Sequence, residues 1–350
     1  HILLALQHLQ NLVRLVENKV VSLPGRGELK FSIIIPVFNR PEELRRAVAS
    51  CLQQTYRDLE VIIVDDCSTE NIKSVCDSFD DERIIYIRNS SNKGASESRN
   101  SGISVATGDY VCFLDSDDIY LDNKFMTIYD NIKESKSEIV IHTQYRILKY
   151  DQNGLIYELM PKKIPHNQEN IAEFIMKDGN FIQTNTFTIN VNVARNAKFQ
   201  KEYKVWDDTQ FLLECISVSK SISYIDMPLS IFFDFVSPDR ISQTRDISNH
   251  IYMMKYLDDD KFGSAKIYFL ALAVSDSIFY RNPSSSIGHI FRAYRNGVSI
   301  RRSIFYLVRC FLGFGRTKTL TTLLKGALAR GTNSTEKHIP GDLLAALGRR

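Results

Sequence analysis

The chain has 350 residues, of which 44% are hydrophobic and 24% are charged, and its formal net charge is +3. These values are typical of a globular protein with one large or two modest domains. The sequence also argues against a membrane-spanning helix, because no uncharged apolar run approaches the roughly 18 residues that such a helix requires.

The six cysteines form no CxxC pair and no other spacing typical of metal ligands. Several of them lie within apolar runs, which is typical of reduced core residues in a cytosolic protein. No signal peptide is evident at the start of the sequence. We therefore expect a cytoplasmic protein.

Residues 1–28 are expected to form an amphipathic helix. Their apolar residues recur at alternating spacings of four and three, as in the seam of a coiled coil: Ile2, Leu6, Leu9, Val13, Val16, Val20 and Leu23. Such a seam makes residues 2–23 a candidate contact between two copies of the chain, a homo-oligomer. The same spacing also fits a single helix packed on its own domain, so both interpretations stay open.

From Phe31 to Asp118 the pattern alternates between short apolar strands and amphipathic helices. The strand patterns are FSIII, LEVIIVD, RIIYIRN and DYVCFLD, and the helix patterns begin at Pro41, near Glu70 and at Gly94. Proline suits the first position of a helix, and unbroken apolar strands are typical of a sheet covered on both faces. The sequence predicts an α/β fold with a mostly parallel sheet flanked by helices.

The polar segments that follow these strands are expected to share one edge of the sheet. The strands continue into PVFNR, DDCST, NKGASESRN and DSDD. In an open α/β sheet, ligands bind outside the carboxyl ends of the strands. The four loops therefore converge on one candidate site.

The DSDD segment is a candidate site for a divalent cation. Asp115 and Asp117 alternate around Ser116 on an extended backbone, so both carboxylates can face one ion. Crowded carboxylates repel one another unless a cation separates them, and Mg²⁺ and Mn²⁺ prefer such hard oxygen ligands. The alternative is a solvated acidic turn that caps the next helix.

The second and third loops offer groups for a nucleotide. Asp65 or Asp66 can accept hydrogen bonds from a base or ribose, or else cap the helix that begins near Glu70. Gly94 lets the backbone approach a ligand closely. Lys93 and Arg99 offer positive charge to phosphate, with simple solvation at the surface as the alternative.

Together, FSIIIPVFNR, VIIVDDCST and NKGASESRNSGISVATGDYVCFLDSDD resemble the nucleotide-sugar domain of family 2 glycosyltransferases, which have the GT-A fold. The resemblance covers about Phe31 to Ile132. It implies a donor such as a UDP-sugar, inversion of the anomeric centre by direct displacement, and a DXD motif at Asp115 and Asp117, with Asp117 as the direct metal ligand. On these grounds the expected nucleotide-sugar-binding residues are Pro36, Val37, Asn39, Asp65, Asp66, Lys93, Gly94, Arg99, Asp115, Ser116 and Arg240.

The second half of the chain offers a catalytic base in KVWDDTQFLLECI. Apolar residues at helical spacing place Asp207 and Asp208 at the start of a helix, where the dipole also favours simple capping by anions. The pair resembles the family's ED motif, which supplies the base. Matching puts Asp208 in the base position and Asp207 where the family usually has Glu, so the choice between them stays open. Trp206 can form the floor of an acceptor-sugar site or pack in the core.

The segment FFDFVSPDRISQT lies where related enzymes often carry an arginine or histidine and a serine near the donor diphosphate. Arg240 and Ser242 are the matching candidates, although the flanking residues depart from the usual pattern.

The charge of the chain is unevenly distributed. Between Ser284 and Thr335 there are nine basic residues and no Asp or Glu, so the remainder carries about −6 (3 − 9). Residues 287–330 are therefore expected to contact an anionic membrane surface, with helices packed on the catalytic domain as the alternative and nucleic acid as a less favoured third partner. This interpretation predicts a peripheral position at the inner face of the cell membrane.

The expected organisation is an amphipathic helix (1–28), a GT-A-type domain (29–245) with a nucleotide-sugar half (31–132) and an acceptor half (133–245), a helical basic region (246–332) and a flexible tail (333–350). The expected function is transfer of a hexosyl or N-acetylhexosaminyl group, with Mn²⁺ or Mg²⁺, to a glycan or lipid-linked acceptor in cell-envelope polysaccharide synthesis. The alternative is an inactive scaffold that binds a nucleotide sugar or glycan.

Overall fold

The structure is a computed structural model. It describes residues 29–234 apart from 152–153, 163, 166–169, 178–179 and 204, and beyond them residues 253, 255–257, 262, 265–273, 283–296, 298, 300, 303–307 and 341–347. The predicted N-terminal helix, its oligomer contact at 2–23, and Arg240 and Ser242 lie outside the described residues.

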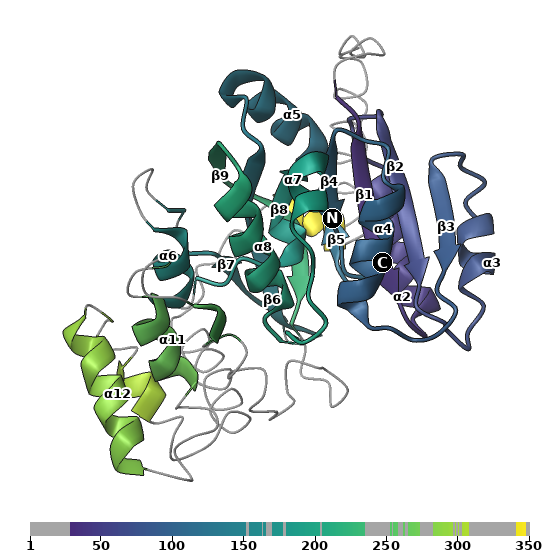
Figure 1. Cartoon of the computed structure of the whole chain (residues 1–350). Coiled ribbons are helices and arrows are strands. Elements are labelled where there is room, and N and C mark those ends of the chain that lie inside the picture. Colours follow the sequence, from purple (N-terminus) through teal and green to yellow (C-terminus); the bar gives the residue numbers. More distant parts are fainter. Residues whose placement is uncertain are drawn as a thin grey trace, which may run out of the picture.

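The first half of the sheet is parallel, as the sequence predicts. Its strands lie side by side in the order β3 (Ile84–Arg88), β2 (Leu59–Asp65), β1 (Phe31–Val37) and β4 (Tyr110–Phe113). Every residue of β1, β2 and β4 is buried, which explains why these strands read as continuous apolar runs. Figure 1 shows this half on the right, with helices on both faces.

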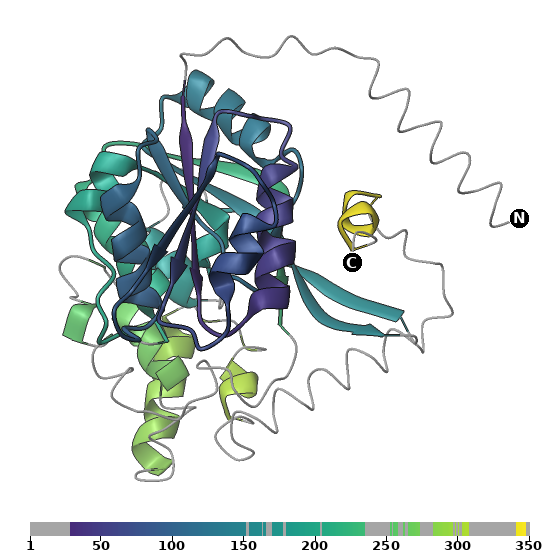
Figure 2. The same ribbon diagram turned by 90° about the vertical axis from the view of Figure 1, so that its right-hand side faces the viewer.

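The second half of the chain extends the same sheet with mixed pairing. Beyond β4 the order continues through β8 (Phe187–Asn190), β6 (Ile139–Asp151), β9 (Ile222–Phe233) and β5 (Ile119–Tyr120). The β8 strand is antiparallel to both β4 and β6, whereas β6 and β9 are parallel. The β7 strand (Gly154–Met160) forms with β6 a long hairpin that projects from the body (Figure 2).

Alternation along the strands divides the core into two layers. Ile33 and Ile35 of β1 pack in one layer, and Ile34 packs in the other. The first layer contains α2 (Pro41–Leu52), α3 (Ile72–Asp77) and α5 (Lys124–Ser135), and the second contains α4 (Ala95–Val105), α7 (Val191–Asn196) and α8 (Asp207–Val218).

The α4 helix approaches β1 very closely. A Cβ atom at Gly102 would lie only 2.4 Å from Cγ2 of Ile34, so this position has room only for glycine unless Ile34 shifts. The close contact fixes α4 against the sheet, and α4 carries Arg99.

The described helices of the C-terminal region join the second core layer. Phe269 of α11 (Ala265–Ala273) and Ile290 of α12 (Pro283–Arg295) belong to the same cluster as Phe174 of α6 (Ile171–Lys177). These helices lie at the lower left of Figure 1. Among the described residues, no helix is long and apolar enough to span a bilayer.

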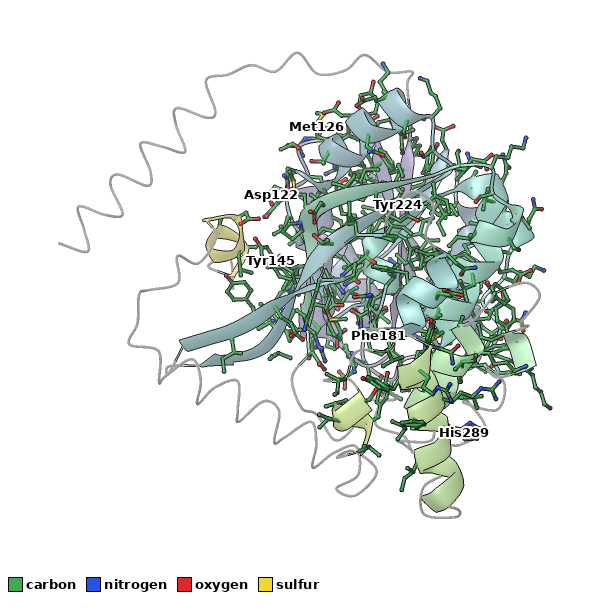
Figure 3. All side chains as sticks on the ribbon, turned by 90° about the vertical axis from the view of Figure 1, so that its left-hand side faces the viewer. Asp122, Met126, Tyr145, Phe181, Tyr224 and His289 are labelled. Atoms are coloured by element: carbon green, nitrogen blue, oxygen red, sulfur yellow. The ribbon has the colours of Figure 1, made fainter. Side chains whose placement is uncertain are left out.

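Part of the predicted flexible tail is instead a packed helix, α15 (Gly341–Leu347). The Leu343 side chain is fully buried against β6 and β9, and the Tyr145 hydroxyl donates to Asp342 at 3.3 Å. Figure 3 shows Tyr145 beside this helix. A buried leucine and a hydrogen bond hold the helix in place, and composition alone does not reveal either contact.

Candidate active site

The carboxyl ends of the four parallel strands meet at one edge. Val37 of β1 pairs with Asp65 of β2, which in turn pairs with Arg88 of β3. Beyond the strands, the Asp66 amide donates to the Val37 carbonyl at 2.8 Å, and the Leu114 amide donates to the Ile34 carbonyl at 3.0 Å. The loops after β1, β2 and β4 therefore begin side by side, as the predicted site requires.

The Asp65 carboxylate is fully buried by its own partners. It accepts hydrogen bonds from the Tyr86 hydroxyl at 2.7 Å and the Ser68 amide at 2.8 Å, and it pairs with Arg88. Burial alone would raise the pKa of Asp65, but the hydrogen bonds and the Arg88 charge lower it. In this state Asp65 supports the loops around it, and its contact with a base or ribose stays a prediction.

The Asp66 carboxylate shapes the third loop. It accepts from the backbone amides of Lys93 at 2.9 Å and Gly94 at 2.7 Å, and from the Asn89 side chain at 2.8 Å. Gly94 has φ +87° and precedes α4, and a Cβ built there would meet no atom within 4 Å. The left-handed backbone explains the glycine, and the space beside it stays open to a ligand.

Asn39 ties the first loop to the second. Its side-chain oxygen accepts a hydrogen bond from the backbone amide of Thr69 at 2.8 Å, and its backbone amide donates to the Ser68 hydroxyl at 2.9 Å. Pro36 and Val37 are buried in β1, whereas the neighbouring Phe38 is 45% exposed. The predicted residues Pro36 and Val37 therefore offer mainly backbone, and Phe38 is the exposed side chain at this point of the edge.

The DXD loop presents two carboxylates at the edge. Asp115 pairs with Arg99 at 2.7 Å and Asp117 with Arg40 at 2.8 Å, and the two aspartate side chains are 37% and 26% exposed. Ser116, predicted to bind the donor, is buried beneath them. The loop is thus ordered with its acids neutralised by arginines.

The adjacent Asp118 has a different role. It is buried and accepts from the Asn185 side chain at 3.1 Å and the Phe233 amide at 2.9 Å. The Asn185 carbonyl in turn accepts from the fully buried Lys124, which also bonds to His142 at 2.7 Å. Burial lowers the pKa of Lys124 to about 7. This polar network lies beneath the DXD loop and anchors it.

The two partly exposed carboxylates of Asp115 and Asp117 suit a divalent ion that takes further ligands from a substrate. Among the described residues there is no group of three His, Cys, Asp or Glu side chains arranged as a complete metal site. Two carboxylates of one short loop suit Mg²⁺ or Mn²⁺, which usually keep waters and take substrate phosphate oxygens as further ligands.

Arg99 joins the DXD loop to the start of α8. One terminal nitrogen donates to Asp115 and the other to Asp207, each at 2.7 Å. The guanidinium is buried, and it lies over the Phe199 ring at 5.3 Å from the centroid. Burial alone would lower the pKa of Arg99, but the two aspartates raise it, so the cation is permanent. The predicted phosphate ligand is, in this state, a bridge between two carboxylates.

Asp207 and Asp208 stand in different environments at the first turn of α8. Asp207 accepts from Arg99 and from the Ser96 hydroxyl at 3.1 Å, whereas Asp208 accepts from the amide and hydroxyl of its neighbour Thr209. Burial and then the charge of Asp207 raise the pKa of Asp208 to about 7. Asp207 shares its charge with a cation, so Asp208 is the carboxylate suited to exchange a proton near neutral pH.

Trp206 is buried rather than open to an acceptor. Its ring lies edge-on to Phe269 with centroids 5.1 Å apart and tilted on Phe181 at 5.9 Å. These contacts favour the core-packing alternative, because a sugar needs an exposed ring face.

Sequence reasoning missed Arg40, Phe38 and Ser96. Arg40 and Phe38 lie in the segment PVFNR, and Ser96 lies in NKGASESRN, so position after a strand was a usable indication for all three. The pairing of Arg99 with Asp207 joins residues 108 apart in sequence, and no local pattern indicates it.

Comparisons with known proteins agree with this geometry. Residues 32–197 match the family model described as Glycosyl transferase family 2. The WfaP protein of Escherichia coli, a UDP-Glc:alpha-D-GlcNAc-diphosphoundecaprenol beta-1,3-glucosyltransferase, is 42% identical over 93 residues, which cover 27% of this chain and 37% of WfaP. The chain spans less than half of the length of several curated relatives, 42% of one and 18% of another.

Two solved structures share the fold at low sequence identity. TarS 1-349 of S. aureus, in complex with UDP-GlcNAc, aligns with a TM-score of 0.59 and 16% identity, covering 86% of this chain and 92% of that one. The mannosyltransferase PcManGT of Pyrobaculum calidifontis, in complex with GDP-Man and Mn²⁺, aligns with a TM-score of 0.53 and 12% identity, covering 94% and 95%. Residues 32–197 are therefore similar to the catalytic domain of glycosyltransferase family 2, and the chain shares the GT-A fold of these glycosyltransferase structures.

Proposed function

We propose that the chain is an inverting glycosyltransferase that moves a hexosyl or N-acetylhexosaminyl group from a UDP-sugar to a glycan or lipid-linked acceptor in cell-envelope polysaccharide synthesis. One observation carries the proposal: buried Arg99 bonds to Asp115 and Asp207, so the DXD loop and the start of α8 share one site. The similarity to WfaP, whose name specifies UDP-Glc and a diphosphoundecaprenol-linked acceptor, supports the choice of donor and acceptor.

The donor would lie along the carboxyl edge of the parallel strands. Phe38 offers an exposed ring face to a base, and the open space beside Gly94 admits a close approach to the backbone. Asp115 and Asp117 would hold a divalent ion, Mn²⁺ or Mg²⁺, which supplies positive charge to the leaving diphosphate. Arg40 pairs with Asp117 at the same edge and can form charge-assisted hydrogen bonds to a diphosphate.

Asp208 is the proposed general base. Its carboxylate would take the proton of the acceptor hydroxyl as that oxygen forms a bond to the anomeric carbon. The bond from the anomeric carbon to the diphosphate oxygen breaks on the opposite side, and the nucleoside diphosphate leaves with the bonding electrons. Attack and departure on opposite sides invert the anomeric centre. Asp207 would act as a positioning residue, because Arg99 and Ser96 already occupy its carboxylate.

A panel of nucleotide sugars tests this function in two steps. With Mn²⁺ present, we expect one UDP-sugar to raise the melting temperature and to release UDP slowly even without acceptor. The Asp208→Asn variant should keep the thermal stabilisation and lose the UDP release. If the wild type is stabilised but releases no UDP with any donor or acceptor, the chain is the scaffold and not the enzyme. If no nucleotide sugar stabilises it, the proposed donor site is wrong.

A further inference from the structure

Large exposed apolar side chains are concentrated in one segment of the described chain. Among the described residues ten large apolar side chains are exposed, and half of them lie between positions 287 and 304: Ile287, Phe291, Tyr294, Ile300 and Ile304. Phe291 is 60% exposed. Single exposed apolar residues are ordinary, but several neighbouring ones on one helix indicate a surface that a partner covers.

Three of these side chains form one row on α12. With 3.6 residues per turn, Ile287, Phe291 and Tyr294 follow one another at helical spacings of four and three. Ile290 and Ala293 occupy the neighbouring sector and are buried against the body of the protein. The exposed row is therefore not the packing face of the helix, because that face is already filled.

Basic side chains border the row. Arg292 and Arg295 are exposed on the side of α12 away from Ile290, and no Asp or Glu occurs from residue 284 to residue 335. Figure 3 shows His289 on the same helix, at the lower extremity of the molecule. An exposed apolar row edged by arginines, without any acid, has the chemistry of a helix that lies in the interface of an anionic bilayer.

The α12 helix is connected to the start of α8 through α11. The Tyr268 hydroxyl of α11 donates to the Asn296 carbonyl just beyond α12 at 2.7 Å, and Phe269 of α11 contacts Trp206, the residue before Asp207. A surface bound at α12 is thus separated from the start of α8 by a single helix.

We propose that the exposed row of α12 (Ile287, Phe291 and Tyr294), with Arg292 and Arg295 beside it, docks the protein on an anionic lipid surface. The apolar side chains enter the boundary between headgroups and acyl chains, and the arginines contact lipid phosphates. The charge of this segment favours an anionic bilayer over a second copy of the chain, because two copies would bring like charges together. The inference goes beyond the proposed sugar transfer and does not depend on it.

Flotation with vesicles tests the proposal without requiring turnover. The full chain should float with phosphatidylcholine vesicles that contain phosphatidylglycerol, and much less with pure phosphatidylcholine or at high salt. Replacing Arg292 and Arg295 by Gln should weaken binding about fivefold per arginine near an anionic surface. Replacing Ile287 and Phe291 by Gln should weaken binding about tenfold or more, because the variant no longer gains the free energy of burying these apolar side chains in lipid.

A matched control separates this surface from general stickiness. Val218 and Met227 are 47% and 43% exposed on other elements of the protein, so the double change to Gln there should leave flotation unchanged. All variants should keep the wild-type melting temperature. Absence of flotation with anionic vesicles, or equal flotation of the α12 variants, overturns the proposal. It is also overturned if the α12 variants change the molar mass in light scattering and not the flotation, since a second copy then covers the row.

Discussion

Replacing Arg99 by Met tests whether one cation holds the site together. The change keeps much of the side-chain volume but leaves Asp207, whose side chain is 16% exposed, without its cationic partner. Removing one member of a buried ion pair costs about 3–5 kcal/mol, because the remaining charge is desolvated and unpaired. The Asp115 pair adds little to this figure, since Asp115 is 37% exposed and solvent screens it.

The loss of stability should depend on pH in a defined direction. Burial raises the pKa of Asp207 and Arg99 opposes that rise, so the variant has a still higher folded-state pKa at this position. A carboxyl whose folded pKa is raised above its unfolded value destabilises the protein as the pH rises through that pKa. The deficit of Arg99→Met should therefore be largest near pH 8 and smaller near pH 5.5.

Urea unfolding at both pH values measures the effect. Arg40→Met is the matched control, because Arg40 pairs with the same loop through a partly exposed pair that solvent screens, and its loss should cost about 1 kcal/mol. Arg99 does not hold the site together if Arg99→Met loses no more free energy of unfolding than Arg40→Met at pH 8. The same conclusion follows if the loss in Arg99→Met is equal at both pH values.

Three further predictions concern catalysis and the metal. The value of kcat/KM, which reports the free enzyme, should rise with pH through about 7 and then level off, because Asp208 must be ionised to accept a proton. Asp207→Asn should move this rise to lower pH, and an unchanged profile would show that the charge of Asp207 does not act on Asp208. Asp208→Asn should lower transfer at least 100-fold with donor affinity by calorimetry unchanged, and near-normal turnover would remove Asp208 from the mechanism. Asp117→Ala should abolish the dependence of UDP-sugar binding on Mn²⁺, measured by calorimetry. If the variant binds the UDP-sugar as tightly as the wild type when Mn²⁺ is present, Asp117 is not a metal ligand.

The strands and the edge of the sheet could be predicted because they depend on local pattern. The runs FSIII and LEVIIVD are apolar on both faces, and the structure buries every residue of β1 and β2. Parallel strands then place Asp65, Asp66 and Asp115 at one edge without any knowledge of tertiary contacts.

The use of each polar side chain could not be predicted in the same way. Its place in the third loop predicts Arg99 as a phosphate ligand, which stays a prediction, whereas its pairing with Asp115 and Asp207 depends on contacts distant in sequence. The residues around Lys124 in sequence do not indicate that the chain buries it beside His142. Pairing partners depend on how the second half of the sheet folds back, and sequence spacing does not encode that distance.

The shared arginine also connects the donor side of the site to the base. Arg99 divides its charge between Asp115 and Asp207, and the charge of Asp207 is one of the causes that raise the pKa of Asp208. Any cation that competes for Asp115 leaves Arg99 to neutralise Asp207 more fully, and a better neutralised Asp207 repels the ionised form of Asp208 less. Donor binding at the DXD loop should therefore lower the pKa of Asp208, so that the base is ionised when the donor is in place. Because part of this coupling passes through Arg99, it should be weaker in Arg99→Met. The pKa read from kcat, which reports the complex, should lie below the pKa read from kcat/KM, which reports the free enzyme, and this difference should be smaller in the variant than in the wild type.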